Sequence, residues 1–591
     1  MKVLEHSLDG LADDEAFDLV VVGAGGAGLS AALFAAMDGA RVLVLEHTGL
    51  VGGTTAWSAG TTWVPGSHHA ARVNPDDKLA DARRYLDHAV GERSPSAVRQ
   101  AFLDHGRAAV ETMERGSELK YRPYPRHPDY ISDLPGSTLC GRALEPLPFD
   151  GRRLGTMLSL LRPPIPEFTV LGGMMVDRTD INHLLGMRRS WASLRHAARI
   201  LTRYALDRLR HPRGTRLVMG NALVGRLLYS LMQHPQVTLA LHTSLQAIMR
   251  SPDAAGAVTG VTVAQGDARR TLRVQGGLVL ASGGFNRHPA LREQLLGKIP
   301  AEWCPGAPGH TGEAQTLALK LGAVHGKGAL SPAFWAPVSR RRRADGSQAV
   351  FPHFVMDRAK PGMITVNQQA DRFLNEGTSY HLFGLGMQAA LAQSPSIPAW
   401  LICDARALRA YGIGMVRPGG KGLAPFLADG YLRQGETLTA LAEQLSIPPA
   451  RLVATVERFN AMARTGVDTD FQRGVTAYQH NLGDASLGGP NPNLGPLEEG
   501  PFYAVALYPG DIGAATGLAT DAHANVLQAD GQAIGGLYAI GNDQHSIMGG
   551  AYPAPGITIG PGLVFAYLAS RHALGRRGAR SDPRKNPDFV R

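Results

Sequence analysis

The chain has 591 residues, of which 44% are hydrophobic and 71 are glycine, and its formal net charge is +10. This length is sufficient for two or more domains with sizeable cores. Its three cysteines, Cys140, Cys304 and Cys403, show neither a CxxC pair nor a metal-ligand spacing, so we expect reduced thiols and no metal site. No apolar run reaches the roughly 18 residues of a membrane-spanning helix. The acidic N-terminus lacks the apolar core of an export signal, which predicts a cytoplasmic protein.

A strand, a glycine-rich turn, a helix and a second strand open the chain. Residues 17–22 are an apolar strand, residues 23–28 read Gly-Ala-Gly-Gly-Ala-Gly, and residues 29–37 are a helix of small side chains. The second strand, residues 41–45, ends at Glu46, which lies 23 positions after the first glycine. This βαβ pattern predicts a site for a dinucleotide cofactor.

Each residue of that fingerprint has a mechanical role. Gly23 makes the turn, Gly25 lets the backbone approach a pyrophosphate, and Gly28 allows close packing of helix on strand. Glu46 can accept a hydrogen bond from a ribose hydroxyl. We expect the cofactor to contact Gly23, Gly25, Ala27, Gly28 and Glu46.

The next segment, residues 52–60, is rich in hydroxyl groups and glycine (Gly-Gly-Thr-Thr-Ala-Trp-Ser-Ala-Gly). In isolation it could be an ordinary surface loop. Directly after the βαβ unit, it is predicted to wrap the phosphates and the ring of the cofactor. The expected contacts are Gly53, Thr54, Thr55, Ser58 and Gly60.

The segment from about 150 to 216 is strongly basic. Between Arg188 and Arg216 there are nine arginines and one acidic residue, Asp207. Apolar residues recur at helical spacing beside a stripe of arginines: Trp191, Leu194, Ala198, Leu201, Ala205 and Leu209, with Arg195, Arg199 and Arg203 offset from them. Two interpretations remain open: a solvated helix docked on the protein, or peripheral attachment of residues 187–212 to an anionic membrane. No nucleic-acid-binding motif accompanies the charge, so we expect no nucleic-acid partner.

The pattern of strand followed by glycine returns twice, at residues 277–284 and at residues 536–542. We therefore predict an α/β protein. A Rossmann-like domain of residues 1–290 and 500–591 is interrupted by an α+β substrate domain of residues 291–499. Gly284 and Asn542 are the expected cofactor contacts of the two returning segments. The clearest helices of the inserted domain are residues 438–445 and 451–463, and ligands are expected between the domains.

Near the C-terminus, Tyr552 and Gly556 share one proline-braced turn, Tyr-Pro-Ala-Pro-Gly. A hydroxyl and an amide so close together suit a carbonyl oxygen that gains negative charge during a reaction. The Gly-punctuated run that follows predicts the start of a helix, whose free N–H groups favour a polarised cofactor ring. Ile557 is the expected contact to that ring.

Five segments together resemble the 3-ketosteroid Δ1-dehydrogenases, which are FAD enzymes of the fumarate-reductase flavoprotein superfamily. The segments are residues 23–28, residues 52–65, Arg372-Phe-Leu-Asn-Glu376, Tyr508-Pro-Gly-Asp-Ile-Gly513 and residues 551–561. The resemblance covers most of the chain. The turn at Tyr552 and the segment at Tyr508 point to the steroid branch, and the basic insert points to its longer, membrane-associated, sterol-degrading type.

The resemblance implies FAD-dependent 1,2-desaturation of a 3-ketosteroid, with an external electron acceptor such as a quinone. Tyr552 and the Gly556 amide would hold the 3-keto oxygen, and Tyr380 would remove the proton from C2 while the C1 hydride passes to the flavin N5. Tyr130 would support Tyr380 by a hydrogen bond, because a tyrosine with an ordinary pKa of about 10 needs help to ionise. Tyr121 and Tyr124 lie close to Tyr130 in the sequence and compete for that assignment. Ala554 stands where a glycine is common in the turn.

Other functions stay in competition. A flavin reductase of fumarate-like acids needs arginine and histidine to bind carboxylates, but the C-terminal turn offers Tyr552. A related enzyme could desaturate a different bond of a steroid ring. A non-catalytic flavin-binding membrane module would leave the conjunction of Tyr130, Tyr380 and Tyr552 without a purpose.

Overall fold

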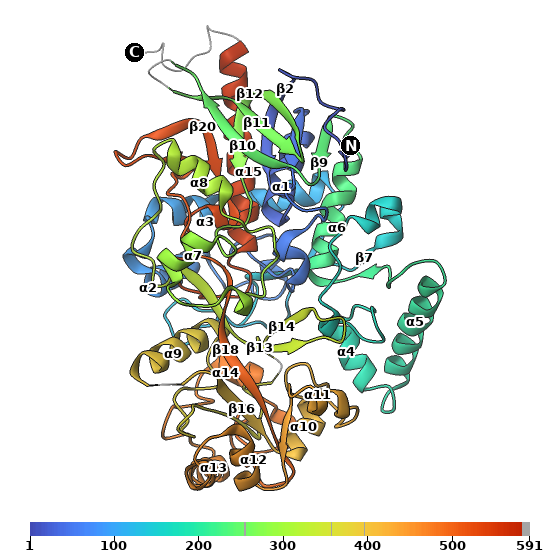
Figure 1. Ribbon diagram of the computed structural model, residues 1–591, viewed down its shortest axis with the longest axis vertical. Helices are drawn as coiled ribbons and strands as arrows, with labels where there is room; N and C mark the ends of the chain where they lie inside the picture. Colours follow the sequence, from blue (N-terminus) through green and yellow to red (C-terminus); the bar gives the residue numbers. More distant parts are fainter. Residues whose placement is uncertain (253–255, 356, 395, 582–591) are drawn as a thin grey trace.

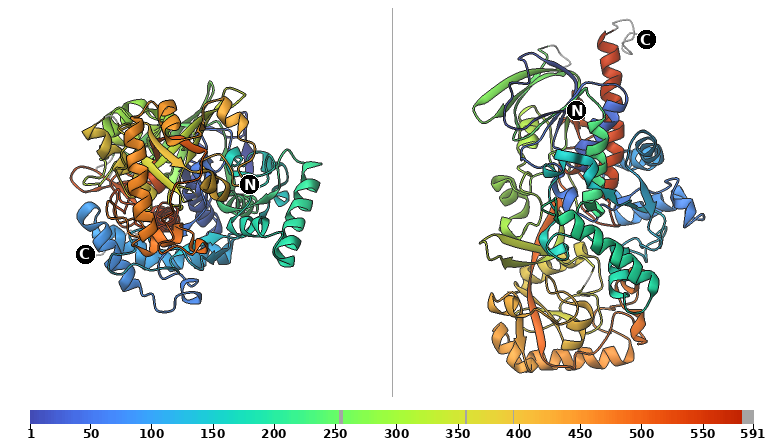
Figure 2. Two further views of the ribbon diagram at one scale, coloured as in Figure 1. Left: turned by 90° about the horizontal axis from the view of Figure 1, so that it is seen from below. Right: turned by 90° about the vertical axis from the view of Figure 1, so that its right-hand side faces the viewer.

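The computed structural model describes residues 1–252, 256–355, 357–394 and 396–581. Two sheets divide the molecule along its long axis. The larger, mostly parallel sheet lies in the upper half of Figure 1, and an antiparallel sheet lies in the lower half. The side view in Figure 2 shows the same division. This arrangement confirms the predicted α/β fold class.

The larger sheet has the βαβ unit near its centre. Its strands are, in spatial order, β1 (Lys2–Leu4), β9 (Val237–Ala240), β3 (Val42–Leu45), β2 (Ala16–Val22), β12 (Ala268–Leu280), β11 (Val258–Gln265) and β10 (Ser244–Arg250), with β20 (Ala533–Ala539) beside β12 and β19 (Asn525–Leu527) beside β20. The central strands are parallel, and Val21 is in register with Val44 on one side and Val279 on the other. Because side chains alternate along a strand, β2 supplies both faces of the sheet with buried apolar residues.

Helices cover one face of this sheet. They are α1 (Gly26–Met37), α3 (Ser96–Gly116), α6 (Met219–Met232) and α15 (Ile559–Ser581), which share one core with the sheet. The short helix α8 (Glu313–Lys320) packs on the opposite face. The helix α15 begins directly after the turn at Tyr552, as the sequence predicts. Its N-terminus therefore lies beside the C-terminal ends of the central strands.

The second sheet carries the helices of the predicted substrate domain. Its strands are β14 (Gln348–Pro352), β13 (Ala333–Arg342), β18 (Phe502–Ala514), β16 (Ala399–Cys403) and β15 (Met363–Val366), with β17 (Arg433–Gly435) beside β18. The surrounding helices are α9 (Tyr380–Gln393), α10 (Ala405–Tyr411), α11 (Ala424–Ala428), α12 (Leu438–Leu445), α13 (Pro449–Thr465) and α14 (Ala477–Leu482). The helices α12 and α13 confirm the two that the sequence predicts. The strand β18 belongs to this sheet, although the sequence analysis assigns residues after 500 to the Rossmann-like domain. The boundaries of the two domains stay a prediction.

Three smaller groups complete the fold. They are the strands β4 (Thr62–Trp63), β6 (Ala143–Pro146) and β5 (Tyr121–Pro123), the helices α2 (Leu79–Ala89) and α7 (Pro289–Leu296), and the basic insert with β7 (Phe149–Asp150), α4 (Arg178–Leu185), α5 (Trp191–Arg208) and β8 (Arg216–Leu217). The insert lies on the flank of the molecule, at the right of Figure 1.

The predicted basic helix forms as α5, but its inward face differs from the predicted apolar stripe. The residues that α5 buries are Ser193, Ala197, Ile200, Tyr204 and Asp207. The predicted stripe points outward instead, and Trp191 and Leu209 are 78% and 80% exposed. Within the described residues, no helix is long and apolar enough to cross a membrane.

Candidate active site

The glycine turn between β2 and α1 has the shape that a dinucleotide needs. A Cβ atom added at Gly28 would lie 1.9 Å from the carbonyl oxygen of Gly23, so the close approach of helix to strand requires glycine. A Cβ atom at Gly25 would meet no heavy atom within 4 Å. The space in front of Gly25 and the N-terminus of α1 is therefore open, which fits a pyrophosphate held by backbone N–H groups.

Glu46 lies at the end of β3 and is buried against the glycine turn. Its carboxylate accepts hydrogen bonds from the Ala24 amide at 3.0 Å, and from the amide and hydroxyl of Thr48 at 2.9 and 2.7 Å. A carboxylate has about four lone-pair sites, so acceptor capacity remains for a ribose hydroxyl.

The loop after β3 returns to the same turn. The Thr55 hydroxyl accepts a hydrogen bond from the Gly26 amide at 3.2 Å. The Thr54 hydroxyl accepts one from the Ala307 amide at 2.8 Å. Ser58 is used within its own turn, where it donates to the Thr55 carbonyl at 2.8 Å. Thr55 and the backbone at Gly53 thus lie beside the turn at residues 25–26, Thr54 contacts the segment at Ala307, and Ser58 and Gly60 shape the end of the loop.

Two segments from later in the chain complete the cradle, which is the expected cofactor site around Gly25. Gly284 donates its amide to the buried carboxylate of Asp543 at 3.1 Å, and Ser282 donates its hydroxyl to the same carboxylate at 2.8 Å. A Cβ atom at Gly284 would lie 3.5 Å from the Cβ of Asn542. Asp543 was missed by the sequence reasoning; its signal is the one acid in the segment that follows β20. The two segments therefore lie side by side, as their repeated pattern predicts.

The three predicted tyrosines come together from three distant segments. Tyr130 lies in a loop before β6, Tyr380 is the first residue of α9, and Tyr552 lies in the turn before α15. Their ring centroids are 5.5 Å apart for Tyr130 and Tyr380, 5.1 Å for Tyr380 and Tyr552, and 5.9 Å for Tyr130 and Tyr552. The hydroxyl of Tyr130 donates to that of Tyr380 at 3.5 Å. All three side chains are buried.

The turn at Tyr552 is held rigidly. The Pro553 carbonyl accepts hydrogen bonds from the Tyr130 amide at 2.7 Å and the Tyr85 hydroxyl at 2.5 Å. Gly556 has a φ of +87°, and a Cβ atom there would lie 2.3 Å from the Thr61 carbonyl oxygen, so only glycine fits. Ala554 has no positive φ and is accommodated as alanine.

The Gly556 amide is a hydrogen-bond donor that the described part of the chain leaves unpaired. Its own carbonyl accepts from the Trp63 amide at 3.2 Å and from the Gly560 amide at 2.9 Å. Among the residues that the structure describes, none accepts a hydrogen bond from the Gly556 N–H. Gly556 is partly exposed, so its unpaired N–H is open to an acceptor outside the chain.

The competing tyrosines point elsewhere. The Tyr121 hydroxyl lies 3.2 Å from the Thr62 hydroxyl, and the Tyr124 hydroxyl lies 3.2 Å from the Thr61 hydroxyl. Of the three tyrosines in this part of the sequence, Tyr130 is the one in ring contact with both Tyr380 and Tyr552.

Further aromatic residues surround the cluster, and the sequence reasoning missed them. Tyr478, in α14, lies 4.7 Å from Tyr130 between ring centroids, Phe354 lies 4.9 Å from Tyr380, and Phe334 lies 5.1 Å from Tyr552. No motif marks these residues, since they enter the site through tertiary packing. The result is a buried aromatic cluster that carries three phenol groups, a chemistry that suits a flat, apolar substrate.

A buried arginine holds the backbone next to the aromatic cluster. Arg358 is fully buried and donates to the carbonyl oxygens of Glu376 and Thr378, both at 2.6 Å, just before Tyr380. It also donates to the carbonyls of His353 at 3.2 Å and Phe354 at 3.0 Å. Four of its five N–H donors are therefore bound to backbone carbonyls, and two of these carbonyls lie just before Tyr380.

The electrostatic environment favours the neutral phenols. Burial raises the pKa of Tyr380 well above its ordinary value, and Tyr130 and Tyr552 raise it further. Burial also raises the pKa of Tyr130 and Tyr552. The hydrogen bond from Tyr130 to Tyr380 is the predicted contact, and its assistance to the ionisation of Tyr380 stays a prediction. The remaining local source of help is the N-terminus of α9, whose dipole favours negative charge at its first residue.

Comparison with known proteins places this cradle and aromatic cluster in a family. The profile described as the FAD binding domain matches residues 18–559. The 3-oxosteroid 1-dehydrogenase of Mycobacterium tuberculosis is 36% identical over 581 residues, which cover 95% of this chain and 99% of that protein. The 4-oxocyclohex-2-ene-1-carboxylate 5-dehydrogenase of Sinomonas cyclohexanicum is 36% identical over 571 residues, covering 96% and 95%.

A solved structure agrees over the whole fold. The crystal structure of 3-ketosteroid Δ1-dehydrogenase from Sterolibacterium denitrificans, in complex with 1,4-androstadiene-3,17-dione, has a TM-score of 0.88 and 32% identity, and the match covers 95% of this chain and 100% of that one. The chain therefore belongs to the FAD-binding domain family and, within it, to the group that contains the 3-oxosteroid 1-dehydrogenases. It is an FAD-dependent oxidoreductase, as the sequence predicts.

Proposed function

We propose that this protein desaturates the C1–C2 bond of 3-ketosteroids. The observation that carries the proposal is the convergence of Tyr130, Tyr380 and Tyr552 in one aromatic cluster, with the unpaired Gly556 amide in the same turn as Tyr552. Bound FAD supplies the acceptor for the C1 hydride. The residues of the chain then have to bind the ketone and take the C2 proton.

Tyr552 and Gly556 would stabilise the enolate that forms when C2 loses its proton. Each donor of such an oxyanion site contributes about 3–4 kcal/mol to the transition state. The rigid turn keeps both donors in place, because Pro553 is bound to the segments of Tyr85 and Tyr130. The proton passes from C2 to the phenolate oxygen of deprotonated Tyr380, which becomes a neutral hydroxyl, and the C2–H electron pair enters the developing enolate.

A second candidate is a monocyclic ketone that carries a carboxylate, since one relative is named for such a substrate. A carboxylate of this kind needs a cation or several donors within the site. Arg358 is a buried cation near the tyrosines, and four of its five N–H donors are bound to backbone carbonyls. This commitment favours the uncharged steroid. It also argues against fumarate-like acids.

The test is a comparison of substrates with the purified, FAD-loaded protein and an artificial electron acceptor under anaerobic conditions. A 4-en-3-one steroid, 4-oxocyclohexanecarboxylate and succinate are supplied in separate reactions. We expect the 1,4-dien-3-one product from the steroid and at least tenfold lower kcat/KM with the two acids. Turnover of 4-oxocyclohexanecarboxylate alone would establish the second candidate, and turnover of succinate alone would establish a fumarate-type enzyme.

We also propose that α5 attaches the protein to the inner face of an anionic membrane. The helix docks through one face and leaves apolar side chains outside, among them Trp191, Leu194 and Leu209. Exposed arginines flank them: Arg188, Arg189, Arg195, Arg199, Arg208 and Arg210. Apolar side chains among cations are the composition of an interfacial helix. Both the steroid and an external quinone acceptor would be concentrated in such a membrane.

Vesicle sedimentation tests the attachment. We expect the protein to sediment with phosphatidylglycerol vesicles at low salt and to be released from them by high salt. It should not sediment with phosphatidylcholine vesicles. A Trp191→Ser/Leu209→Ser variant should bind several-fold more weakly, whereas Leu487→Ser, exposed in another part of the chain, should bind like the wild type. Wild-type protein that stays in the supernatant with anionic vesicles at low salt would refute the attachment.

A further inference from the structure

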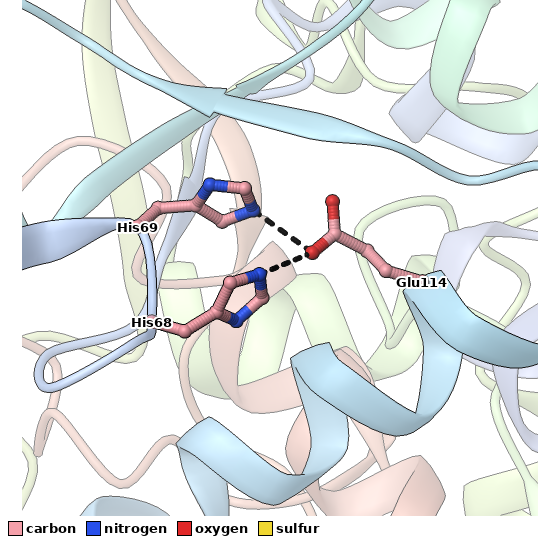
Figure 3. Close-up of side chains that lie close together, drawn as sticks. All are labelled: His68, His69 and Glu114. Atoms are coloured by element: carbon pink, nitrogen blue, oxygen red, sulfur yellow. Dashed lines mark hydrogen bonds and ion pairs between the residues drawn. The ribbon is translucent and has the colours of Figure 1, made fainter. Parts of the chain in front are cut away.

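Two adjacent histidines lie beside a glutamate, and none of these three residues belongs to the tyrosine cluster. His68 and His69 precede the short helix η2 (Ala70–Arg72), and Glu114 lies in the last turn of α3. The Nε2 atoms of His68 and His69 lie 2.9 and 2.8 Å from the same carboxylate oxygen of Glu114. Figure 3 shows both rings directed at that oxygen.

The geometry of the three groups is that of ligands around one ion. The ligand atoms of His68, His69 and Glu114 all lie within 4.8 Å of one another. Ligands bonded at about 2.0–2.1 Å to one tetrahedral ion are about 3.3 Å apart, so each Nε2 would have to move only about 0.5 Å away from the carboxylate oxygen to admit the ion. The other oxygen of Glu114 accepts the Tyr121 amide at 2.8 Å and so fixes the orientation of the carboxylate.

Hydrogen bonds alone leave this cluster poorly satisfied. The Nδ1 atoms of both histidines are buried and have no hydrogen-bond partner among the described residues. His68 has the Glu114 carboxylate at Nε2 and the Glu111 carboxylate 3.9 Å from Nδ1. A neutral imidazole carries one N–H, so it can direct that N–H at only one of these two anions.

A bound cation would resolve this conflict at His68. A cation at Nε2 would replace the proton there and leave Nδ1–H facing Glu111. Metal-bound histidines commonly direct their second nitrogen at a carboxylate in this way.

We propose that His68, His69 and Glu114 bind one divalent transition-metal ion of the zinc class. Two imidazoles and one carboxylate are a ligand set that such ions use. Two glutamates, Glu114 and Glu111, compensate the charge of the ion. His68 is 26% exposed, which provides an entry path, while His69 is almost fully buried.

The ion would clamp the segment after β4 onto the end of α3. The strand β4 ends at Trp63, whose amide donates to the Gly556 carbonyl at 3.2 Å. The clamp would therefore stabilise one support of the C-terminal turn without touching the reacting groups. Its effect should appear as thermal stability and bound metal.

The experiment uses the untagged, FAD-loaded protein, stripped with a chelator and then titrated with Zn²⁺ by calorimetry. We expect one ion per chain and a higher Tm with Zn²⁺. His68→Ala and Glu114→Gln should weaken binding at least about tenfold. His105→Ala, an exposed histidine on α3, should bind like the wild type.

Flavin content and circular dichroism of each variant establish that it is folded, and His68→Ala is the decisive variant because this side chain is partly exposed. Folded His68→Ala that binds Zn²⁺ as tightly as the wild type would overturn the proposal. So would wild-type protein that retains no Zn²⁺ above the level of the folded His68→Ala variant.

Discussion

At the scale of single residues, the candidate site depends on where three phenols and one amide are held. Tyr380 is the first residue of α9, Tyr130 is fixed by its amide to Pro553, and Tyr552 shares the turn of Gly556. Burial raises the pKa of the Tyr380 and Tyr552 hydroxyl groups. Tyr552 is therefore a neutral donor, as an oxyanion site requires, and Tyr380 is a base only when it has lost its proton.

Tyr552→Phe removes one of the two proposed donors to the ketone. We expect kcat to fall by about 10²–10³-fold with FAD still bound, because one oxyanion donor is lost. Steady-state kinetics with a 4-en-3-one steroid measures the change. Tyr121→Phe is the matched control, since its buried hydroxyl pairs with Thr62 outside the cluster and its loss should leave kcat within a few-fold. A Tyr552→Phe variant as active as the control would exclude the donor role.

The pH dependence follows from the raised pKa of Tyr380. The active form is deprotonated, so its fraction grows as pH rises toward that pKa. We expect log kcat/KM to increase from about pH 7 to about pH 9, at constant flavin content, with a slope that approaches one. A flat profile over this range would mean that another group takes the proton or that proton removal does not limit the rate.

At the scale of elements, a buried ionic network supports the segment before Tyr380. Glu376 lies between Arg372 at 2.7 Å and Arg473 at 3.3 Å, and Arg372 also binds Asp468 at 2.8 Å. Burial alone would raise the pKa of Glu376, but the two arginines outweigh burial and the pKa is lowered. The stability that this pairing provides is complete above the ordinary pKa of glutamate and is lost as pH falls through the lowered value.

Glu376→Gln leaves two buried arginines without their shared partner. We expect a loss of about 3–5 kcal/mol in the free energy of unfolding, measured by urea denaturation of the FAD-loaded protein at neutral pH. Glu443→Gln, on the exposed face of α12, should change it by less than about 0.5 kcal/mol. Equal stability of the two variants would show that the network contributes nothing to the fold.

The elements also show what sequence patterns can and cannot give. Periodicity predicts α12, α13 and α5, because the spacing of apolar residues is a local property. Periodicity does not tell which face of α5 packs against the protein, because Ile200 and Tyr204 contact Met174 and Val176 only in the folded chain. The same limit applies to Tyr478 and Arg358, which reach the tyrosines through tertiary packing and carry no motif.

At the scale of the whole molecule, the chain returns three times to the cradle near Gly25. The βαβ unit, the segment after β12 and the segment after β20 meet there, and α15 begins beside them. Glycine patterns made these returns predictable, because close approach of backbone has a sequence signature. The place of β18 was not predictable, since this strand follows residue 500 but pairs with β13 and β16 of the expected substrate domain. The meeting of His69 with Glu114, 45 positions apart, has no local signature either.

Gly28→Val tests the cradle as a whole. A side chain at Gly28 would collide with the Gly23 carbonyl, which a Cβ atom would approach to 1.9 Å, so the turn must open. We expect the flavin-to-protein ratio after gel filtration to fall at least about tenfold. Gly575→Ala, where a Cβ atom meets nothing within 4 Å, should retain the wild-type ratio. Full flavin content in Gly28→Val would place the cofactor elsewhere.

The central claim is that Tyr380 takes the C2 proton of a bound 3-ketosteroid. The most direct measurement is the rate of 1,4-dien-3-one formation from a 4-en-3-one steroid by the Tyr380→Phe variant at matched flavin content. We predict a rate lower by about 10²–10⁴-fold, because a positioned general base is lost while the FAD cradle is untouched. A Tyr380→Phe variant that binds FAD and forms product at the wild-type rate would contradict the account.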